Sequence, residues 1–145
     1  MAEKKPQSLA NHTRFDFLFH FFAFPIFAFA VIWSIAHFIR HPGLHTAGLF
    51  LLLTAAAVAV AKVRTYATKI QDRVICLEER LRLAALLAEP LRSRIPELTE
   101  GQLVALRFAS DGEVSKLAER ALNEKLARAD IKKSIQNWRP DYWRV

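Results

Sequence analysis

Four of the five histidines lie within or beside two long apolar segments, where an ionisable side chain is a candidate for function. His20 lies inside the first segment, and His37, His41 and His45 cluster around its end. His37 and His41 are four residues apart, a spacing that places two imidazoles on one face of a helix. His20 and His37 are therefore candidates for binding a haem or pigment, and His37, His41 and His45 are candidates for a metal site.

The surroundings of these histidines favour a simpler interpretation. Pro42 and Gly43 end any helix directly after His41, and no carboxylate or cysteine lies nearby. The chain also lacks a phosphate-binding loop, a His-Glu-x-x-His motif and a nucleophile motif around a serine or cysteine. We therefore expect a protein that is not an enzyme and that holds neither a cofactor nor a metal.

The two apolar segments, 17–39 and 44–61, contain no Asp, Glu, Lys or Arg and are separated by only four residues. Each approaches the roughly 20 residues that an α-helix needs to cross a lipid bilayer. A connection this short requires a helical hairpin. The sequence therefore predicts a membrane protein with both termini on one side.

Basic residues predict which side that is. Three precede the first segment and four follow the second by position 73, whereas the loop contains one, Arg40. The positive-inside rule places both termini in the cytoplasm. Residues 1–14 are polar, and no small-residue cleavage site closes the first segment, so we expect both spans to remain in the mature protein.

The rest of the chain is an ordinary charged sequence. Residues 62–145 contain 17 of the 21 Lys and Arg residues and 12 of the 14 Asp and Glu residues. The excess positive charge matches a cytoplasmic segment that faces anionic lipid. We expect the lipid bilayer as a partner and no nucleic acid.

The two spans differ in composition. Residues 15–38 contain nine of the eleven phenylalanines, distributed all round the helix, and Pro25 is expected to kink it. The second span contains pairs of small residues four apart, which let membrane helices approach closely. These are Ala55 with Ala59 and Ala57 with Ala61. We predict that the second span is the inner, contact-making helix.

No Gly or Pro occurs from Leu49 to Glu89, which predicts one continuous helix from about residue 44 to 88. Its cytoplasmic part, 62–89, has a heptad pattern typical of a coiled coil. The predicted packing seam consists of Ala55, Ala59, Val63, Ala67, Ile70, Val74, Leu77 and Leu81. The helix could pack on its own C-terminal helices, since Ile75, Leu83, Leu86 and Leu87 widen the apolar face. It could equally form a homo-oligomer, and the two interpretations are compatible.

Charged residues outside this seam are interpreted as a solvated face. Glu79 belongs to this face, and Glu78 and Arg82 are expected to pair four residues apart.

Residues 90–145 predict a small helical module. Thr99 with Gln102, and Ser110 with Glu113, match the capping box that begins a helix. Asp130 is expected to cap a third short helix that ends near residue 138.

The C-terminal tail is rich in residue types that dominate protein interfaces. Trp138, Arg139, Tyr142 and Trp143 are predicted to dock onto a partner. Stacking on the module itself and contact with the membrane surface are the alternatives.

Several segments resemble a bacterial two-span membrane-protein family that is known only as a domain of unknown function. The similar segments are 8–14 (SLANHTR), 71–75 (QDRVI), 77–82 (LEERLR), 106–111 (LRFASD) and 131–142. The resemblance implies a bacterial inner-membrane protein and carries no activity or catalytic residue with it.

The sequence thus predicts an all-α membrane protein in four parts: residues 1–14, a hairpin at 15–61, a heptad helix at 62–89 and a module at 90–145. We expect a structural or interaction protein, either a homo-oligomer or an accessory subunit of a larger membrane complex. A small oligomeric channel is the alternative, although no polar stripe lines either span. A pigment- or haem-binding subunit is a further alternative.

Overall fold

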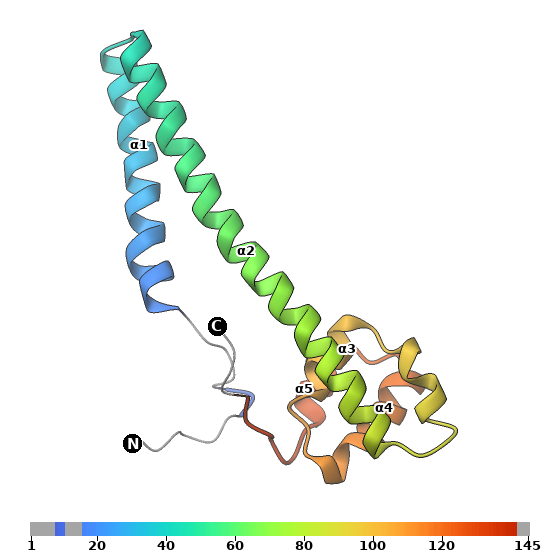
Figure 1. Cartoon of the computed structure of the whole chain (residues 1–145). Coiled ribbons are helices and arrows are strands. Elements are labelled where there is room, and N and C mark those ends of the chain that lie inside the picture. The colour runs from blue at the N-terminus through green and yellow to red at the C-terminus, as the bar shows by residue number, and fades with distance from the viewer. Residues whose placement is uncertain (1–7, 11–15, 142–145) are drawn as a thin grey trace, which may run out of the picture. The chain divides into compact units, whose positions relative to one another are not determined.

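The computed structural model describes residues 8–10 and 16–141, and within these residues the protein is all-α (Figure 1). The helical segments are the π-helix η1 (Leu18–Ala23), α1 (Phe24–Arg40), α2 (Leu44–Leu86), the 3-10 helix η2 (Arg92–Glu97), α3 (Glu100–Leu106), α4 (Asp111–Asn123) and α5 (Arg128–Ser134). They form two compact units, and α2 contributes to both. One unit contains residues 16–68, and the other contains residues 8–10 and 69–141.

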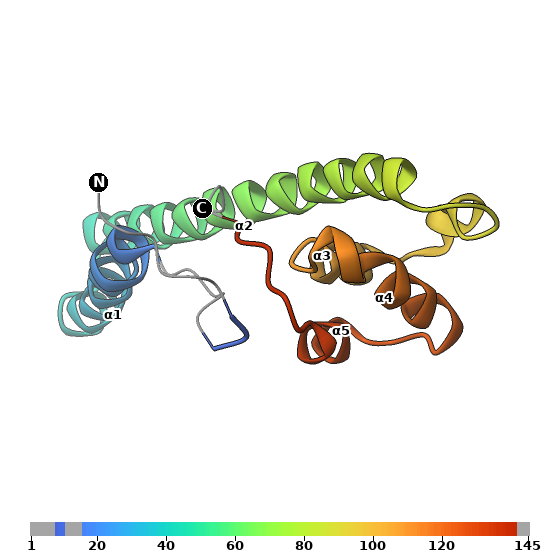
Figure 2. The same ribbon diagram turned by 90° about the horizontal axis from the view of Figure 1, so that it is seen from below.

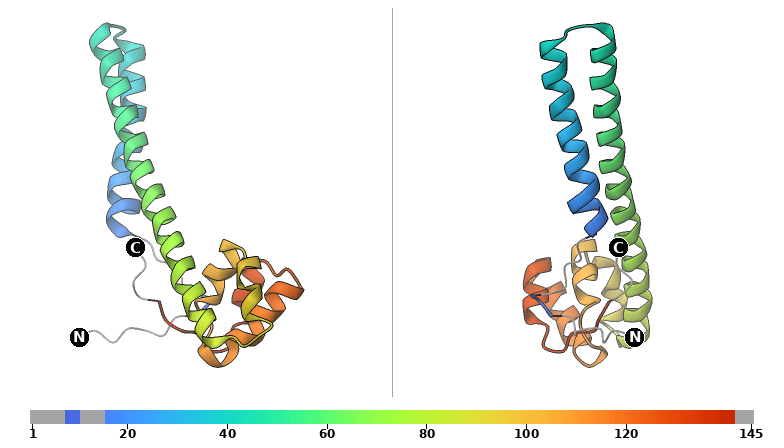
Figure 3. Two further views of the ribbon diagram at one scale, coloured as in Figure 1. Left: turned by 45° about the vertical axis from the view of Figure 1, so that its right-hand side comes forward. Right: turned by 90° about the vertical axis from the view of Figure 1, so that its left-hand side faces the viewer.

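The first unit is a helical hairpin in which α1 runs antiparallel to the first part of α2 (Figures 1 and 3). The turn is closed by the Thr46 hydroxyl, which donates hydrogen bonds to the carbonyls of His41 at 2.8 Å and Gly43 at 2.9 Å. Two helical stretches are long and apolar enough to cross a membrane, namely Leu18–Arg40 and Leu44–Leu86. The continuous helix predicted to start at residue 44 is thus present, and it ends at Leu86.

Pro25 lies in the first turn of α1, directly after the π-helical turn. Proline has no N–H, and its ring collides with the carbonyl four residues earlier in a regular α-helix. Here the Phe24 N–H donates to the Phe19 carbonyl, five residues back. In this wider turn the backbone N–H group directly before Pro25 pairs with a carbonyl five residues back instead of four. Such a local change of hydrogen bonding allows a proline inside a long helix. The structure thus places a π-helical turn directly before Pro25, and the kink stays a prediction.

In the second unit, α3, α4 and α5 surround a core to which the last turns of α2 contribute (Figure 2). The largest fully buried side chains of this core are Leu83, Leu87, Leu103, Leu106, Phe108, Val114 and Ile131. Gln102 is buried as well, and its amide nitrogen donates to the carbonyls of Ala121 at 2.9 Å and Leu126 at 3.1 Å. This amide ties α3 to both ends of the connection between α4 and α5.

Both predicted capping boxes are confirmed. Thr99 caps α3 with Gln102, and Ser110 caps α4 with Glu113. The prediction that Asp130 caps the third helix is wrong, because the cap position of α5 is Ala127. Asp130 lies inside the first turn instead, where its negative charge is favourable beside the exposed N–H groups of the helix start.

Candidate functional site

The second unit buries one face of α2, and this face contains a charge. Ile75, Cys76, Leu83 and Leu87 are buried there, as expected for the apolar side of a helix that packs on a core. Glu79 lies among them and is only 3% exposed. The interpretation of Glu79 as part of a solvated face is therefore wrong, because the C-terminal helices cover it.

Arg82 neutralises this buried carboxylate and links α2 to α4. It forms an ion pair with Glu79, and its Nη2 lies 2.6 Å from Oδ1 of Asp111. The same nitrogen donates to the Ala109 carbonyl at 2.7 Å. The predicted pairing of Arg82 with Glu78 is wrong, because Arg82 turns toward the module instead. A charged group buried with a partner and several hydrogen bonds avoids most of its desolvation cost.

A second buried cation lies beside the first. Arg107 is 6% exposed, and its Nη1 lies 3.1 Å from Oδ2 of Asp141. Its guanidinium also stacks over the ring of Phe108, 4.4 Å from the ring centre. The Phe108 ring also contacts Trp138, with ring centres 5.2 Å apart and the ring planes tilted by 39°. The start of the C-terminal tail is thus held on the module by an ion pair and by an aromatic contact.

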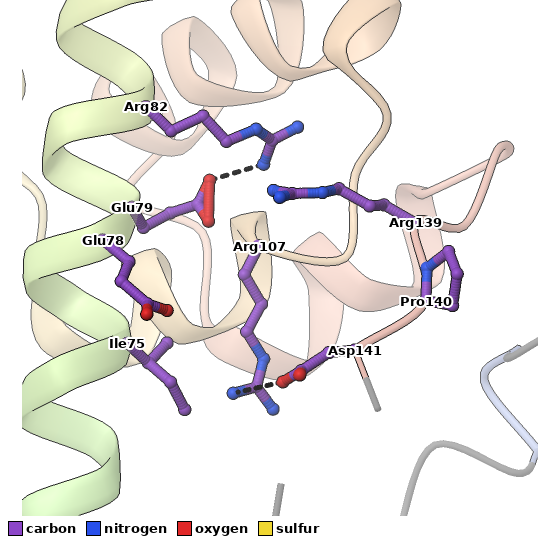
Figure 4. A pocket seen from close by; sticks show the side chains of 8 residues that line it. All are labelled: Ile75, Glu78, Glu79, Arg82, Arg107, Arg139, Pro140 and Asp141. Atoms are coloured by element: carbon purple, nitrogen blue, oxygen red, sulfur yellow. Dashed lines mark hydrogen bonds and ion pairs between the residues drawn. The ribbon is translucent and has the colours of Figure 1, made fainter. Parts of the chain in front are cut away.

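These charged groups line a cavity of about 460 Å³ (Figure 4). Its lining consists of Ile75, Glu78, Glu79, Arg82, Arg107, Arg139, Pro140 and Asp141. Guanidinium groups favour carboxylate and phosphate partners, but here Arg82 and Arg107 already contact carboxylates of the same chain. Among the described residues, this lining includes no histidine, serine, threonine or cysteine. The arrangement consists of two sets of ion pairs: Arg82 joins α2 to the module, and Arg107 joins the module to the tail.

Three of the pKa shifts in this unit concern groups on the buried face of α2 or paired with it. Burial raises the pKa of Glu79 above its ordinary value, and Arg82 offsets part of that rise. The hydrogen bond from Arg82 lowers the pKa of Asp111. Burial also raises the pKa of the Cys76 thiol, which keeps the sulfur protonated and unreactive. Cys76 is a packing residue, as its place in the core indicates.

The histidines named as candidate ligands do not come together in one common site. The Nδ1 atom of His20 lies 2.8 Å from the Asp16 carbonyl oxygen. The His37 ring stacks on Trp33 and lies near His41, each at 5.2 Å between ring centres. His45 is exposed. Within residues 8–10 and 16–141, no group of three or more His, Cys, Asp or Glu residues could hold a metal ion.

Two apolar grooves flank the hairpin of the first unit. One, of about 340 Å³, lies between the helices and includes Phe27, Val31 and Ala57 in its lining. The other, of about 400 Å³, includes Phe19, Val63 and Arg64. Arg64 also pairs with Asp16 at 3.8 Å, so this second groove has a charged rim. Few polar groups line either groove, which leaves little to orient a bound cofactor.

The predicted packing seam is exposed in the single chain. Its members Ala55, Ala59, Val63, Ala67, Ile70, Val74, Leu77 and Leu81 all have exposed side chains. The C-terminal helices pack on a different face of α2. The helix can therefore pack on its own C-terminal helices and also associate with a second copy through the seam. The seam as an interface stays a prediction.

The predicted docking tail is only partly described by the structure. Trp138 is half-buried against Phe108, and the Arg139 N–H donates to the Phe108 carbonyl at 2.7 Å. The Arg139 side chain is exposed. Tyr142 and Trp143 lie outside the described residues. Trp138 therefore stacks on its own module, which was one of the alternatives considered for the tail.

Sequence reasoning missed Glu79, Arg107 and Asp141 as a cluster. A signal for Glu79 was present, because it lies four residues from both Ile75 and Leu83 and so shares their helix face. No comparable local signal marks Arg107 or Asp141, which meet only through the fold.

The protein belongs to the broad class of all-α proteins, and it combines an apolar helical hairpin with a small charged helical unit. Within it, the whole chain, residues 1–145, matches a family described as a family of unknown function (DUF6526), and the protein belongs to this family. No curated protein matches the chain. No solved structure matches it either.

Proposed function

We propose that this protein is a membrane-anchored structural or interaction protein. In this proposal, α1 and the first part of α2 cross a bacterial inner membrane, and both termini lie in the cytoplasm. The second unit then presents a helical surface to partners. These partners are other copies of the chain or further subunits of a membrane complex.

The main support is the exposure of large apolar side chains on both helices. Only 6% of the most apolar window of each helix is buried. Phe29, Ile32 and Leu52 are 70%, 66% and 67% exposed. Exposing apolar surface to water costs about 25 cal/mol per Å². A large contiguous apolar surface therefore marks a site of contact with another protein or with a membrane. The same side chains are favourable in a bilayer.

Several polar groups of the hairpin are paired as a bilayer requires, whereas the buried Thr54 hydroxyl has no hydrogen-bond partner among the described residues. Polar groups in a hydrocarbon environment must find partners within the protein. The buried Ser34 hydroxyl donates to the Val31 carbonyl at 2.8 Å, and Thr46 donates to two carbonyls of the turn. At the other end of the hairpin, Asp16 and Arg64 pair with one another. Charges paired at the edge of an apolar segment suit the boundary between lipid and water.

Membrane insertion and orientation can be tested together with single-cysteine variants of the full-length chain. Cys76→Ala supplies a cysteine-free background, to which either His41→Cys in the hairpin turn or Lys69→Cys beyond the spans is added. We expect the chain in the membrane fraction after alkaline carbonate extraction. A membrane-impermeant maleimide should label His41→Cys in intact cells, and Lys69→Cys only after permeabilisation. Extraction into the soluble fraction would overturn the membrane proposal, and reversed labelling would overturn the orientation.

A further inference from the structure

We propose that two copies of this chain associate in parallel and in register through one exposed face of α2. This α2 face consists of Ile70, Val74, Leu77 and Leu81, all within the second unit. The proposal rests on the proposed function, because two copies inserted in one membrane with the same orientation run parallel.

The first argument is the exposure of these four side chains. They are 64%, 49%, 59% and 65% exposed, in chain order. Their spacing alternates between four and three residues, so they form one stripe along the helix that can interlock with an identical stripe. A row of large apolar residues that the described part of its own chain leaves uncovered is a contact surface for another chain.

The second argument is that the module covers the opposite face. Glu79 lies at the centre of the buried face, between Ile75 and Leu83. With 3.6 residues per turn, Leu77 and Leu81 lie about 160° round the helix from Glu79. A second helix can therefore pack on the α2 face while the module stays in place.

The third argument is charge complementarity. It favours a second copy of the chain as the partner, and it favours the parallel direction over the antiparallel one. Arg73 and Glu78 lie on opposite flanks of the α2 face, in the two positions that form salt bridges between the helices of a coiled coil. In a parallel pair in register, Arg73 of each copy lies beside Glu78 of the other. An antiparallel pair would instead bring Arg73 toward Arg80 of the second copy, and like charges repel.

Disulfide trapping in the full-length, membrane-embedded protein tests this pairing. In the Cys76→Ala background, Leu77→Cys places a thiol on the α2 face, and Lys69→Cys is the matched control on another exposed side of the same helix. A disulfide requires Cα atoms within about 7 Å of each other. We expect mild oxidation to link Leu77→Cys at least about tenfold more than Lys69→Cys. Equal linkage, or no linkage at Leu77→Cys, would overturn the proposal.

The location of the chain is recorded in the same experiment. A chain that stays in the membrane fraction but gives no Leu77→Cys dimer defeats the pairing and leaves the membrane proposal standing. Recovery of the chain in the soluble fraction would overturn the membrane proposal. The presence or absence of a Leu77→Cys disulfide in that soluble chain would still support or overturn the pairing of α2.

Charge reversal tests the parallel direction. Arg73→Glu alone and Glu78→Arg alone each set like charges against one another, and we expect each to lower Leu77→Cys linkage about fivefold. The double variant restores opposite charges between the copies and should recover the linkage. Arg73 and Glu78 are five residues apart on one helix and do not face each other within a chain, so recovery reports a contact between copies. Increased linkage for Arg73→Glu alone, or no recovery in the double variant, would overturn the parallel arrangement.

Discussion

The Nη2 atom of Arg82 lies 2.6 Å from Oδ1 of Asp111, so one side chain of α2 reaches the first turn of α4. The same guanidinium pairs with the buried Glu79. Arg82 therefore compensates the buried charge of Glu79 and also connects α2 to α4.

Replacing Arg82 should destabilise the second unit strongly. Arg82→Met leaves Glu79 buried without its ion-pair partner, and removing one member of a buried pair costs about 3–5 kcal/mol. The measurement is chemical denaturation of the full-length protein in detergent, followed by circular dichroism. Arg80→Met, at an exposed position of the same helix, is the control and should change little. The double variant Glu79→Leu with Arg82→Met should recover most of the loss, and a double variant no more stable than Arg82→Met would contradict this role of Glu79.

Glu79 should also set a pH dependence of stability. Its pKa in the folded protein lies above the ordinary value of 4.5, so its favourable contribution is complete below pH 4.5 and is lost as the pH rises through the folded pKa. Asp111 has the opposite sign, because its lowered pKa gives a contribution that is lost as the pH falls through the folded value. Glu79→Gln should therefore flatten the decline in the free energy of unfolding as the pH rises above 4.5. Parallel curves for the wild type and this variant would argue against a raised pKa, and Glu119→Gln, at an exposed position of α4, is the control.

Glu113 should control the order of the segment before the tail. Its carboxylate accepts hydrogen bonds from the backbone N–H groups of Ser110, Gln136 and Asn137, at 3.3, 3.1 and 3.1 Å. Glu113→Ala removes both carboxylate oxygens and with them all three hydrogen bonds, and should cost at least the roughly 1 kcal/mol of a lost helix cap. Amide hydrogen exchange should accelerate more at residues 136 and 137 than at the buried Gln102. Unchanged exchange at 136 and 137 would show that this carboxylate does not hold the segment.

Pro25 should be the cause of the π-helical turn. Pro25→Ala restores an N–H that can donate four residues back and removes the ring from the preceding carbonyl. We expect Leu18–Ala23 to become regular α-helix, with the Phe24 N–H moving from the Phe19 carbonyl to that of His20. Nuclear magnetic resonance of the detergent-solubilised protein can follow this change through the backbone shifts of residues 18–24. Persistence of the π-helical turn in the variant would assign its origin to another residue.

Local patterns predicted the elements of the fold well. The two capping boxes and the long helix from Leu44 were legible because each depends on residues a few positions apart. Asp130 was misassigned because an acidic residue fits both the cap and the first turn of a helix. A kink was predicted at Pro25, but sequence periodicity cannot reveal the single wider turn that precedes it.

The charged site was harder to predict because its members meet through tertiary packing. The heptad pattern placed Glu79 away from the apolar seam, which is correct, but it could not show that α3 and α4 cover that side. Arg107 and Asp141 are far apart in the chain, and nothing near either residue indicates the other. Long-range ion pairs of this kind depend on how the elements pack, whereas caps and helix lengths do not.

The central claim is a membrane-embedded pair of chains joined along α2. The most direct test is the mass of the particle that mild detergent extracts from native membranes, measured by light scattering with the detergent contribution removed. We predict a particle with two copies of the chain, which Leu77→Glu converts to one copy while the Lys69→Glu control stays paired. A wild-type particle with one copy and no other protein, or a chain that remains in solution without detergent, would contradict the claim.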